Sequence, residues 1–297
     1  MESSEVRFGP DGERCAATFY RPGGVGGRRP CVLMAHGVTL TRCDGIPDYA
    51  ERFAAAGFAA LAFDYRHWGD SEGEPRRWVS LRRQLEDWRA AVAYVRTLEG
   101  VDQERVAVWG MSLGGGHALL TAAADRSVAA VVALTPMTDG VAICLKPSPP
   151  NVALRSTWRA VREAITRRPV TMPVAGPPRA FAALDAPEAL PGFRRLAATN
   201  GWRNEVNAGA ALGLLRYRPV RRATRIQAPV LFQVGERDEM APLSPIETSA
   251  ARAPRGELIR YPIDHFGSFW PEHIDRVVDD ELDFLRRHLL ASDPRAR

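Results

Sequence analysis

The sequence predicts an α/β protein with a mostly parallel central sheet, helices on both faces and one inserted, mainly helical cap. Three observations predict it. Short apolar runs alternate with helical patterns along most of the chain. The alternation stops in residues 136–191, which hold ten of the 23 prolines. It resumes near residue 229 and ends in an amphipathic helix. We therefore expect a core formed by residues 1–137 and 221–297 and a cap formed by residues 138–220.

The first part of the chain supplies alternating elements. Unbroken apolar runs predict strands at residues 31–35, 58–63, 105–109 and 128–134. Helical patterns predict helices at residues 48–56, 81–95 and 113–124. In the second of these helices the apolar positions recur at steps of three and four, which places them on one face.

The last part of the chain repeats this pattern. We expect strands at residues 229–234 and 257–261, and helices at 244–252 and 271–290, the last with Pro271 in its first turn. Inside the cap, short helices are expected near residues 154–165 and 208–215. Five aromatic residues of the cap are expected to be buried: Trp158, Phe181, Phe193, Trp202 and Tyr217.

The composition indicates a cytoplasmic globular protein. Its 297 residues are 45% hydrophobic and 25% charged, enough to bury a core without disulfides. No apolar run approaches the roughly 20 residues of a membrane span, and the N-terminus lacks a basic segment followed by an apolar one. The four cysteines have no metal-ligand spacing, so reduced thiols are expected. We expect no membrane partner.

The net charge of +5 comes almost wholly from arginine, since Lys146 is the only lysine. The arginines are spread along the chain rather than gathered on one element with aromatic residues between them. This pattern argues against nucleic-acid binding. It leaves a mild attraction to anionic substrates or carriers.

Residues 110–114 form a G-x-S-x-G pattern between an expected strand and an expected helix. A sharp turn there would push the Ser112 hydroxyl out at the carboxyl edge of the sheet, beside the free N–H groups of a helix N-terminus. Ser112 is therefore the candidate nucleophile. A phosphate-binding loop is disfavoured because residues 114–116 lack the G-x-G-x-x-G frame and no lysine follows them.

A nucleophilic serine needs a base, and the chain has six histidines. His265 follows the last expected strand, so it should reach the same sheet edge as Ser112. His67, in the loop after an earlier strand, is its main competitor. His36 lies at a strand end, and three further histidines fall in expected helices: His117, His273 and His288.

The base in turn needs an orienting acid. Asp238 lies in the loop after the strand at residues 229–234, which gives the chain order Ser, Asp, His. Glu236, Glu239 and Asp264 are rivals for this role.

Together these segments resemble an α/β-hydrolase over about residues 15–137 and 222–290. The resemblance rests on His36 and Gly37 after a strand, and on the segments 64–71, 110–114 and 235–238 with His265. Residues 19–23, followed by residues 29–32, are more narrowly similar to the dienelactone-hydrolase and X-prolyl-peptidase-like branch. That branch includes thioesterase-like and acetyl-esterase-like members.

The resemblance implies a role for each residue. Ser112 would be the nucleophile, His265 the general base and then acid, and Asp238 the orienting carboxylate. The backbone N–H groups of Val38 and Leu113 would form the oxyanion hole. Residues 64–71 would brace the loops beside the site, and residues 138–220 stand where the family places its cap. No metal or cofactor is implied.

The expected function is that of a serine hydrolase that cleaves a small-molecule carboxylic ester or thioester through an acyl-enzyme. An alternative is an acyltransferase, cyclase or thioesterase that acts on a chain bound to an acyl carrier protein or CoA. A peptidase and a non-catalytic binding protein are less favoured. The sequence does not specify the substrate or the oligomeric state.

Overall fold

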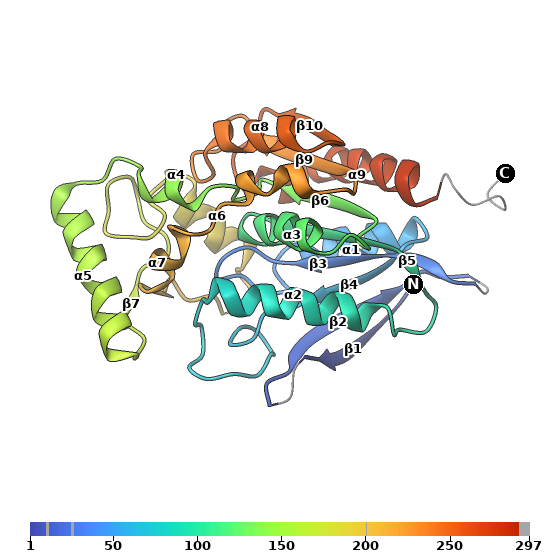
Figure 1. The fold of residues 1–297 in the computed structure, drawn as a ribbon, viewed down its shortest axis with the longest axis horizontal. Helices are drawn as coiled ribbons and strands as arrows, with labels where there is room; N and C mark the ends of the chain where they lie inside the picture. Colours follow the sequence, from blue (N-terminus) through green and yellow to red (C-terminus); the bar gives the residue numbers. More distant parts are fainter. Residues whose placement is uncertain (10–11, 25–26, 200, 291–297) are drawn as a thin grey trace.

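The computed structural model describes residues 1–9, 12–24, 27–199 and 201–290, and these contain an eight-stranded sheet flanked by helices (Figure 1). The strand order is β1-β2-β4-β3-β5-β6-β9-β10, with parallel pairing from β4 to β10. The mostly parallel α/β class predicted from the sequence is confirmed. The last seven residues of the predicted core, 291–297, lie outside the described residues.

The central strands are nearly all apolar because both faces of the sheet are covered. Their bounds are β3 Arg29–Ala35, β4 Ala59–Phe63, β5 Val101–Met111, β6 Ala130–Leu134, β9 Val230–Gly235 and β10 Gly256–Tyr261.

Two further strands at the sheet edge were not predicted. They are β1 Glu2–Phe8 and β2 Cys15–Arg21, which pair antiparallel with each other, and β2 also pairs antiparallel with β4. Strand β1 is mostly polar and partly exposed, as suits an edge strand, so it shows no apolar run in the sequence.

Helices cover both faces of the sheet (Figure 1). Helices α1 and α9 contact each other on one face, while α2 and α3 contact each other on the opposite face, with α8 beside β9 and β10. Their bounds are α1 Ile46–Ala55, α2 Leu81–Val95, α3 Leu113–Ala124, α8 Leu243–Arg252 and α9 Ile274–Leu289.

The predicted start of the last helix was wrong. Helix α9 begins at Ile274, so Pro271 is not in its first turn. The segment before it forms a 3₁₀ turn, Gly267–Phe269, and the Trp270 carbonyl then accepts the N–H groups of His273 and Ile274. Because this turn precedes it, helix α9 begins three residues later than predicted.

The predicted cap, residues 138–220, lies between β6 and β9. Its elements are α4 Gly140–Cys144, α5 Pro150–Thr166, β7 Thr171–Met172, α6 Ala189–Leu196, β8 Val206–Asn207 and α7 Ala210–Leu214. Strands β7 and β8 pair only with each other. Phe193 and Tyr217 are buried, as expected, and Phe181 and Trp202 are half-buried. Trp158 is exposed because α5 stands at the end of the molecule (Figure 1).

In the described parts of the chain, no helix combines the length and the apolar character that crossing a membrane requires. The four cysteines all lie in these parts, and none of them forms a disulfide.

Candidate active site

The three residues predicted for catalysis follow the carboxyl ends of three parallel strands. Ser112 directly follows β5, Asp238 follows β9 and His265 follows β10. Because β5, β6, β9 and β10 are successive parallel neighbours, their carboxyl ends lie at one edge of the sheet. Ligands of open α/β sheets bind at this edge.

Ser112 occupies a strained strand-to-helix turn. Its φ of 53° and ψ of −118° are rare for a residue with a side chain. Its N–H donates to the Leu134 carbonyl at 2.9 Å, and its carbonyl accepts the Met137 N–H at 2.9 Å. A Cβ on Gly110 would lie 2.3 Å from the Gly114 backbone, so only glycine fits at this close approach. The structure thus contains the sharp strand-to-helix turn that the sequence predicted, and the role of Ser112 as nucleophile stays a prediction.

His265 and Asp238 form a buried hydrogen-bonded pair. His265 Nδ1 donates to Asp238 Oδ2 at 2.7 Å, and the two side chains are only 2% and 3% exposed. An ionised carboxylate only accepts, so the Nδ1 position carries the proton and Nε2 is left as the basic nitrogen. Asp238 Oδ1 accepts the N–H groups of Met240 and Ala241, each at 2.8 Å. Both carboxylate oxygens are thus engaged, which fixes the ring orientation.

Backbone contacts hold the acid loop against the histidine loop. The N–H groups of Glu236 and Arg237 donate to the carbonyls of Tyr261 and Ile263 at 2.8 and 3.0 Å. A Cβ on Gly235 would lie 2.5 Å from the Ile263 carbonyl oxygen, so the loops touch there. These contacts bring Asp238 and His265 together although they are 27 residues apart in the sequence.

The rival acids lie elsewhere. Glu236 and Glu239 are exposed, and Asp264 accepts the Phe266 N–H at 3.0 Å, which caps the turn behind His265. Asp238 is the acid that the structure places on the His265 ring.

The charges around His265 favour its protonated form. Burial opposes protonation, but the charge and hydrogen bond of Asp238, with the charges of Glu188 and Asp264, raise the pKa of His265 above its ordinary value. A base with a raised pKa accepts a proton from a serine more readily.

The competing histidine, His67, lies in a different network. Its Nδ1 donates to the Pro75 carbonyl at 3.0 Å, and its Nε2 accepts from Arg83 at 3.3 Å. Burial lowers the pKa of His67. These contacts make His67 a structural residue of its loop.

His36 and His117 also have structural contacts. His36 Nδ1 donates to the Gly37 carbonyl at 2.8 Å. His117 lies 3.0 Å from Gln84 Oε1 and 3.1 Å from the Tyr217 hydroxyl, and burial lowers its pKa to about 3. Both rings are buried, and burial lowers the pKa of His36 as well.

Val38 and Leu113, predicted for the oxyanion hole, flank the Ser112 turn. A Cβ on Gly37 would lie 3.2 Å from Ser112 Cβ, so the segment carrying Val38 runs against the serine. Leu113 is the first residue of α3, where N–H groups have no acceptor within the helix. Their role as oxyanion donors stays a prediction.

The segment 64–71, predicted to brace the site, carries ion pairs and hydrogen bonds centred on the buried Asp64. Asp64 is fully buried and accepts the Arg42 N–H at 2.7 Å and the Asp70 N–H at 3.1 Å. The Arg42 guanidinium pairs with Asp64, and also with Asp70 at 2.9 Å. The contacts between Arg42 and Asp64 hold the loop that follows Val38 in place.

A mainly apolar pocket of about 460 Å³ lies between this edge and the cap. Val38 and Leu113 form part of its core side together with Val79, Leu81 and Met137. Its cap side comes from α4, α5, α7 and the segment 182–186, and Lys146 and Asp185 are its charged lining residues. A pocket of this kind suits an apolar group.

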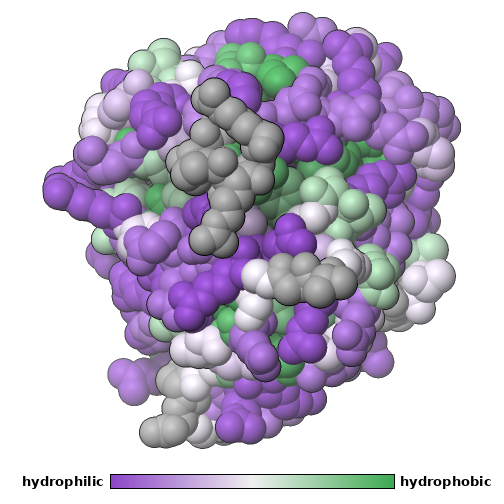
Figure 2. All heavy atoms as spheres, turned by 90° about the vertical axis from the view of Figure 1, so that its right-hand side faces the viewer, coloured by the Kyte–Doolittle hydropathy of each residue, from purple (hydrophilic) through white to green (hydrophobic). Residues whose placement is uncertain are grey.

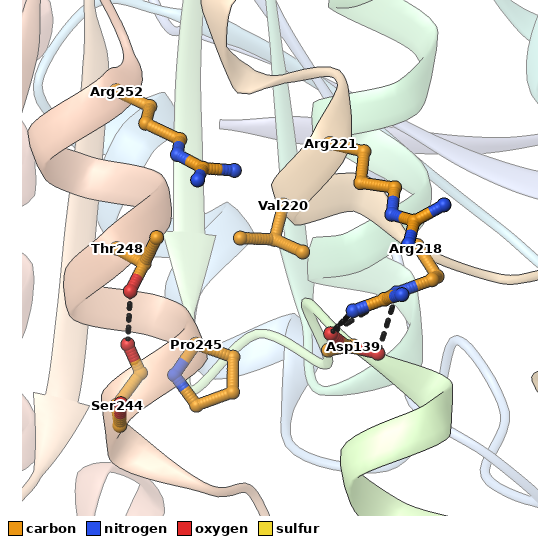
Figure 3. Close-up of a pocket in the computed structure, with 8 residues that line it drawn as sticks. All are labelled: Asp139, Arg218, Val220, Arg221, Ser244, Pro245, Thr248 and Arg252. Atoms are coloured by element: carbon orange, nitrogen blue, oxygen red, sulfur yellow. Dashed lines mark hydrogen bonds and ion pairs between the residues drawn. The ribbon is translucent and has the colours of Figure 1, made fainter.

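A second hollow, of about 330 Å³, lies between α8 and the base of the cap and shares no lining residue with the first (Figure 3). Arg218 pairs there with Asp139 at 2.6 Å. Arg221 and Arg252 extend from opposite sides of the hollow (Figure 3). Ser112, Asp238 and His265 line neither hollow, but the first is lined by Leu113, which follows Ser112 in the chain. Within the described ranges, no cluster of three His, Cys, Asp or Glu side chains could hold a metal ion.

Two cap residues that the sequence analysis did not assign touch the acid loop. Glu188 accepts the Glu239 N–H at 2.8 Å, and burial is the main cause of the raised pKa of Glu188. The Lys146 ammonium donates to the carbonyls of Glu239 and Met240. The scarcity of lysine could have drawn attention to Lys146, whereas nothing in the sequence distinguishes Glu188 from other acidic residues.

Comparison with known proteins gives the family. The model of the family described as "Serine aminopeptidase, S33" (Hydrolase_4) matches residues 26–263. The chain belongs to this family. It is a hydrolase of the α/β-hydrolase superfamily, as the sequence resemblance implied, while the narrower branch named above stays a prediction.

Individual relatives differ in described activity. The chain is 40% identical over 288 residues to the quorum-quenching protein AidA of Acinetobacter baumannii, covering 95% of this chain and 94% of that protein. It is 35% identical over 137 residues to the thiohydrolase aneE of Aspergillus aculeatus, covering 46% of this chain and 42% of that protein. A solved structure of DcsB with a substrate analogue superposes with a TM-score of 0.83 at 23% identity, covering 98% and 100% of the two chains. That likeness concerns the fold.

Proposed function

We propose that this protein hydrolyses a carboxylic ester, thioester or lactone that carries an apolar acyl chain. The observation that carries the proposal is the buried His265–Asp238 hydrogen bond of 2.7 Å at the sheet edge where Ser112 occupies its strained turn. Acid, base and nucleophile are the three groups that acyl transfer to serine requires.

The reaction would proceed in two steps. His265 Nε2 accepts the Ser112 proton as the hydroxyl oxygen attacks the carbonyl carbon, and the N–H groups of Val38 and Leu113 stabilise the oxyanion. The leaving oxygen or sulfur takes the proton back from His265 and departs, leaving an acyl-serine. Water then attacks the acyl carbon, and His265 accepts its proton and returns it to Ser112.

The substrate class follows from the pocket. Its lining is dominated by aliphatic side chains of the cap, and its core side includes both predicted oxyanion donors. Ser112 itself does not line the pocket, but Leu113, the next residue, does, so an acyl chain in this pocket would place its carbonyl near Ser112. The resemblance to a quorum-quenching protein over nearly the whole chain adds a lactone with an acyl chain to the candidates, because a lactone is a cyclic ester.

The first experiment is labelling with a serine-reactive fluorophosphonate, read as intact mass. The wild-type protein should gain one adduct, and Ser112→Ala and His265→Ala should gain none. A folded wild-type protein that stays unlabelled would contradict an activated Ser112, as would a Ser112→Ala variant that is still labelled.

The second experiment identifies the scissile bond. A panel of p-nitrophenyl esters, acyl thioesters and N-acyl homoserine lactones, each from acetyl to dodecanoyl, is compared by kcat/KM and by product analysis. We expect the free acid or the ring-opened acid as product and a preference for longer chains. A product in which an added alcohol or amine carries the acyl group would show the acyltransferase alternative instead.

A further inference from the structure

The exposed large apolar residues of this protein are concentrated in the cap. Among the described residues, all of them except Met1 lie between positions 145 and 215. They are Leu145, Leu154, Trp158, Val161, Ile165, Leu212 and Leu215. The opposite end of the molecule shows mainly hydrophilic residues with scattered apolar ones (Figure 2). Apolar patches of this kind mark interaction surfaces.

Four of these residues form one stripe along α5. Leu154, Trp158, Val161 and Ile165 follow one another at steps of four, three and four, so they share one face of the helix. Leu154 and Ile165 are 72% and 76% exposed, and Trp158 is 59% exposed. Helix α5 buries only Ala160 and Glu163. We call this set the α5 stripe.

The other side of α5 forms a wall of the apolar pocket. Val152, Ser156 and Ala160 line that pocket and lie roughly half a turn away from the α5 stripe. Leu145, Leu212 and Leu215 both line the pocket and are exposed. The pocket lining and the exposed apolar surface therefore meet at the pocket rim.

The charges beside the α5 stripe are all positive. Arg155, Arg159 and Arg162 lie on one flank of the helix, and Arg167 and Arg168 follow its end. The carboxylate of α5, Glu163, is buried and accepts hydrogen bonds from Asn207 and Gly209. An apolar stripe flanked by arginines is complementary to a partner that has both apolar groups and negative charges.

A second copy of the chain fits this surface poorly. In an antiparallel pair of α5 stripes, the twofold axis would bring the arginine flanks of both copies to one seam. In a parallel pair each arginine flank would face a side of the partner's α5 that offers no exposed carboxylate to neutralise it. Like charges placed opposite each other destabilise a helix pair.

We propose that the α5 stripe docks on a lipid surface that contains anionic headgroups. Leucine, isoleucine and tryptophan side chains would enter the headgroup boundary, and the arginines would lie among the phosphates. The rim of the pocket would then face the lipid, so an apolar substrate dissolved in the lipid would enter without crossing water. The sequence-based expectation of no membrane partner considered only spanning segments. Docking is independent of the chemistry at Ser112.

The test is cosedimentation of the full chain with vesicles. Vesicles of equal parts phosphatidylcholine and phosphatidylglycerol should carry the wild-type protein and Ser112→Ala down equally, whereas pure phosphatidylcholine should carry down much less. The double variant Leu154→Glu/Ile165→Glu should lower the bound fraction about tenfold or more, because it places carboxylates in the apolar stripe. Its fold is checked by circular dichroism.

A charge-matched pair separates local contact from net charge. Arg162→Glu, beside the α5 stripe, should weaken binding severalfold, while Arg89→Glu, exposed on α2, should leave it unchanged. Equal weakening by both variants would overturn the proposal in favour of non-specific attraction. Wild-type protein that stays in the supernatant would overturn it too. A wild-type dimer that becomes monomeric in the Leu154→Glu/Ile165→Glu variant, without lipid binding, would assign the surface to a second copy.

Discussion

The two halves of the cap are packed in opposite ways. On the α6 side, the Phe193 ring lies 5.2 Å from that of Phe266, next to His265, and stacks on Trp202 at 5.2 Å. The Trp202 indole also donates to Thr39, beside Val38, at 3.3 Å. On the α5 side, the stripe of large apolar side chains faces solvent.

This difference separates two tasks. The α6 half contacts the loops that carry His265, the proposed base, and Val38, a predicted oxyanion donor, so its packing would hold the proposed catalytic groups in place. The α5 half borders the pocket. Among the described residues, the hydrogen bonds of α5, such as those of Glu163 with Asn207 and Gly209, are to other cap residues rather than to the loops of Ser112, Asp238 and His265. We therefore expect the α5 half to govern what enters. Changes in the α6 half should therefore alter the chemical step, and changes in the α5 half should alter the choice of substrate.

The largest expected effect comes from breaking the His265–Asp238 hydrogen bond, which lies next to the Phe266 ring that α6 packs against. Asp238→Asn should lower kcat by about 10⁴-fold, because an amide no longer holds the His265 tautomer that leaves Nε2 basic. The matched control is Glu236→Gln, an exposed carboxylate of the same loop, which should retain activity. Steady-state kinetics on the best ester measures both, and equal activity in the two variants would remove Asp238 from the triad.

The next effect breaks the packing of α6. Gly192→Ala would place a Cβ 2.0 Å from the Phe266 ring, so helix or ring must move. We expect a loss of about 1–3 kcal/mol in the free energy of unfolding, together with a lower kcat. Gly213→Ala is the control in α7, where the new Cβ meets only the end of the Leu81 side chain at 3.1 Å. Urea unfolding compares them, and a similar loss in both would contradict the contrast between the halves.

A third change tests the α5 half. Ala160→Leu adds bulk to the pocket wall, so long acyl chains lose room while acetyl esters do not. Each methylene excluded from the pocket costs about 0.8 kcal/mol, so exclusion of two lowers kcat/KM about tenfold. Ala164→Leu, on the same helix outside the pocket lining, should leave the chain-length profile unchanged. A uniform loss across all chain lengths would show that α5 acts on the chemical step.

The smallest effect concerns pH. Burial lowers the pKa of His265, and the charge and hydrogen bond of Asp238 raise it, with a smaller contribution in the same direction from the Glu188 charge. Because His265 acts as a base only when neutral, activity should rise as the pH passes upward through this raised pKa. Glu188→Gln keeps an acceptor for the Glu239 N–H but removes the charge, so the rising limb of the kcat/KM profile should move to lower pH. A limb that stays in place would contradict the coupling.

Local patterns predicted the core elements well. Helices α2 and α3 begin and end where expected, because apolar spacing in one and the turn at Ser112 in the other mark their ends. Strand β1 was not predicted because an edge strand needs no apolar run. The start of α9 was predicted wrongly because its position depends on the turn after Phe266. Trp158 was expected to be buried but is exposed, because no element among the described residues packs over its side of the helix.

By itself, the sequence determined the residue types and chain order of Ser112, Asp238 and His265, because strand-end positions in a parallel sheet must share an edge. Only the tertiary structure paired Asp238, rather than its neighbours, with His265 and placed His67 in a separate network, since these contacts depend on which loops touch across the sheet edge. It also decided that Glu188 influences the base and that the α5 stripe is exposed. These features arise from contacts between residues far apart in the chain, so the local spacing of residue types cannot predict them.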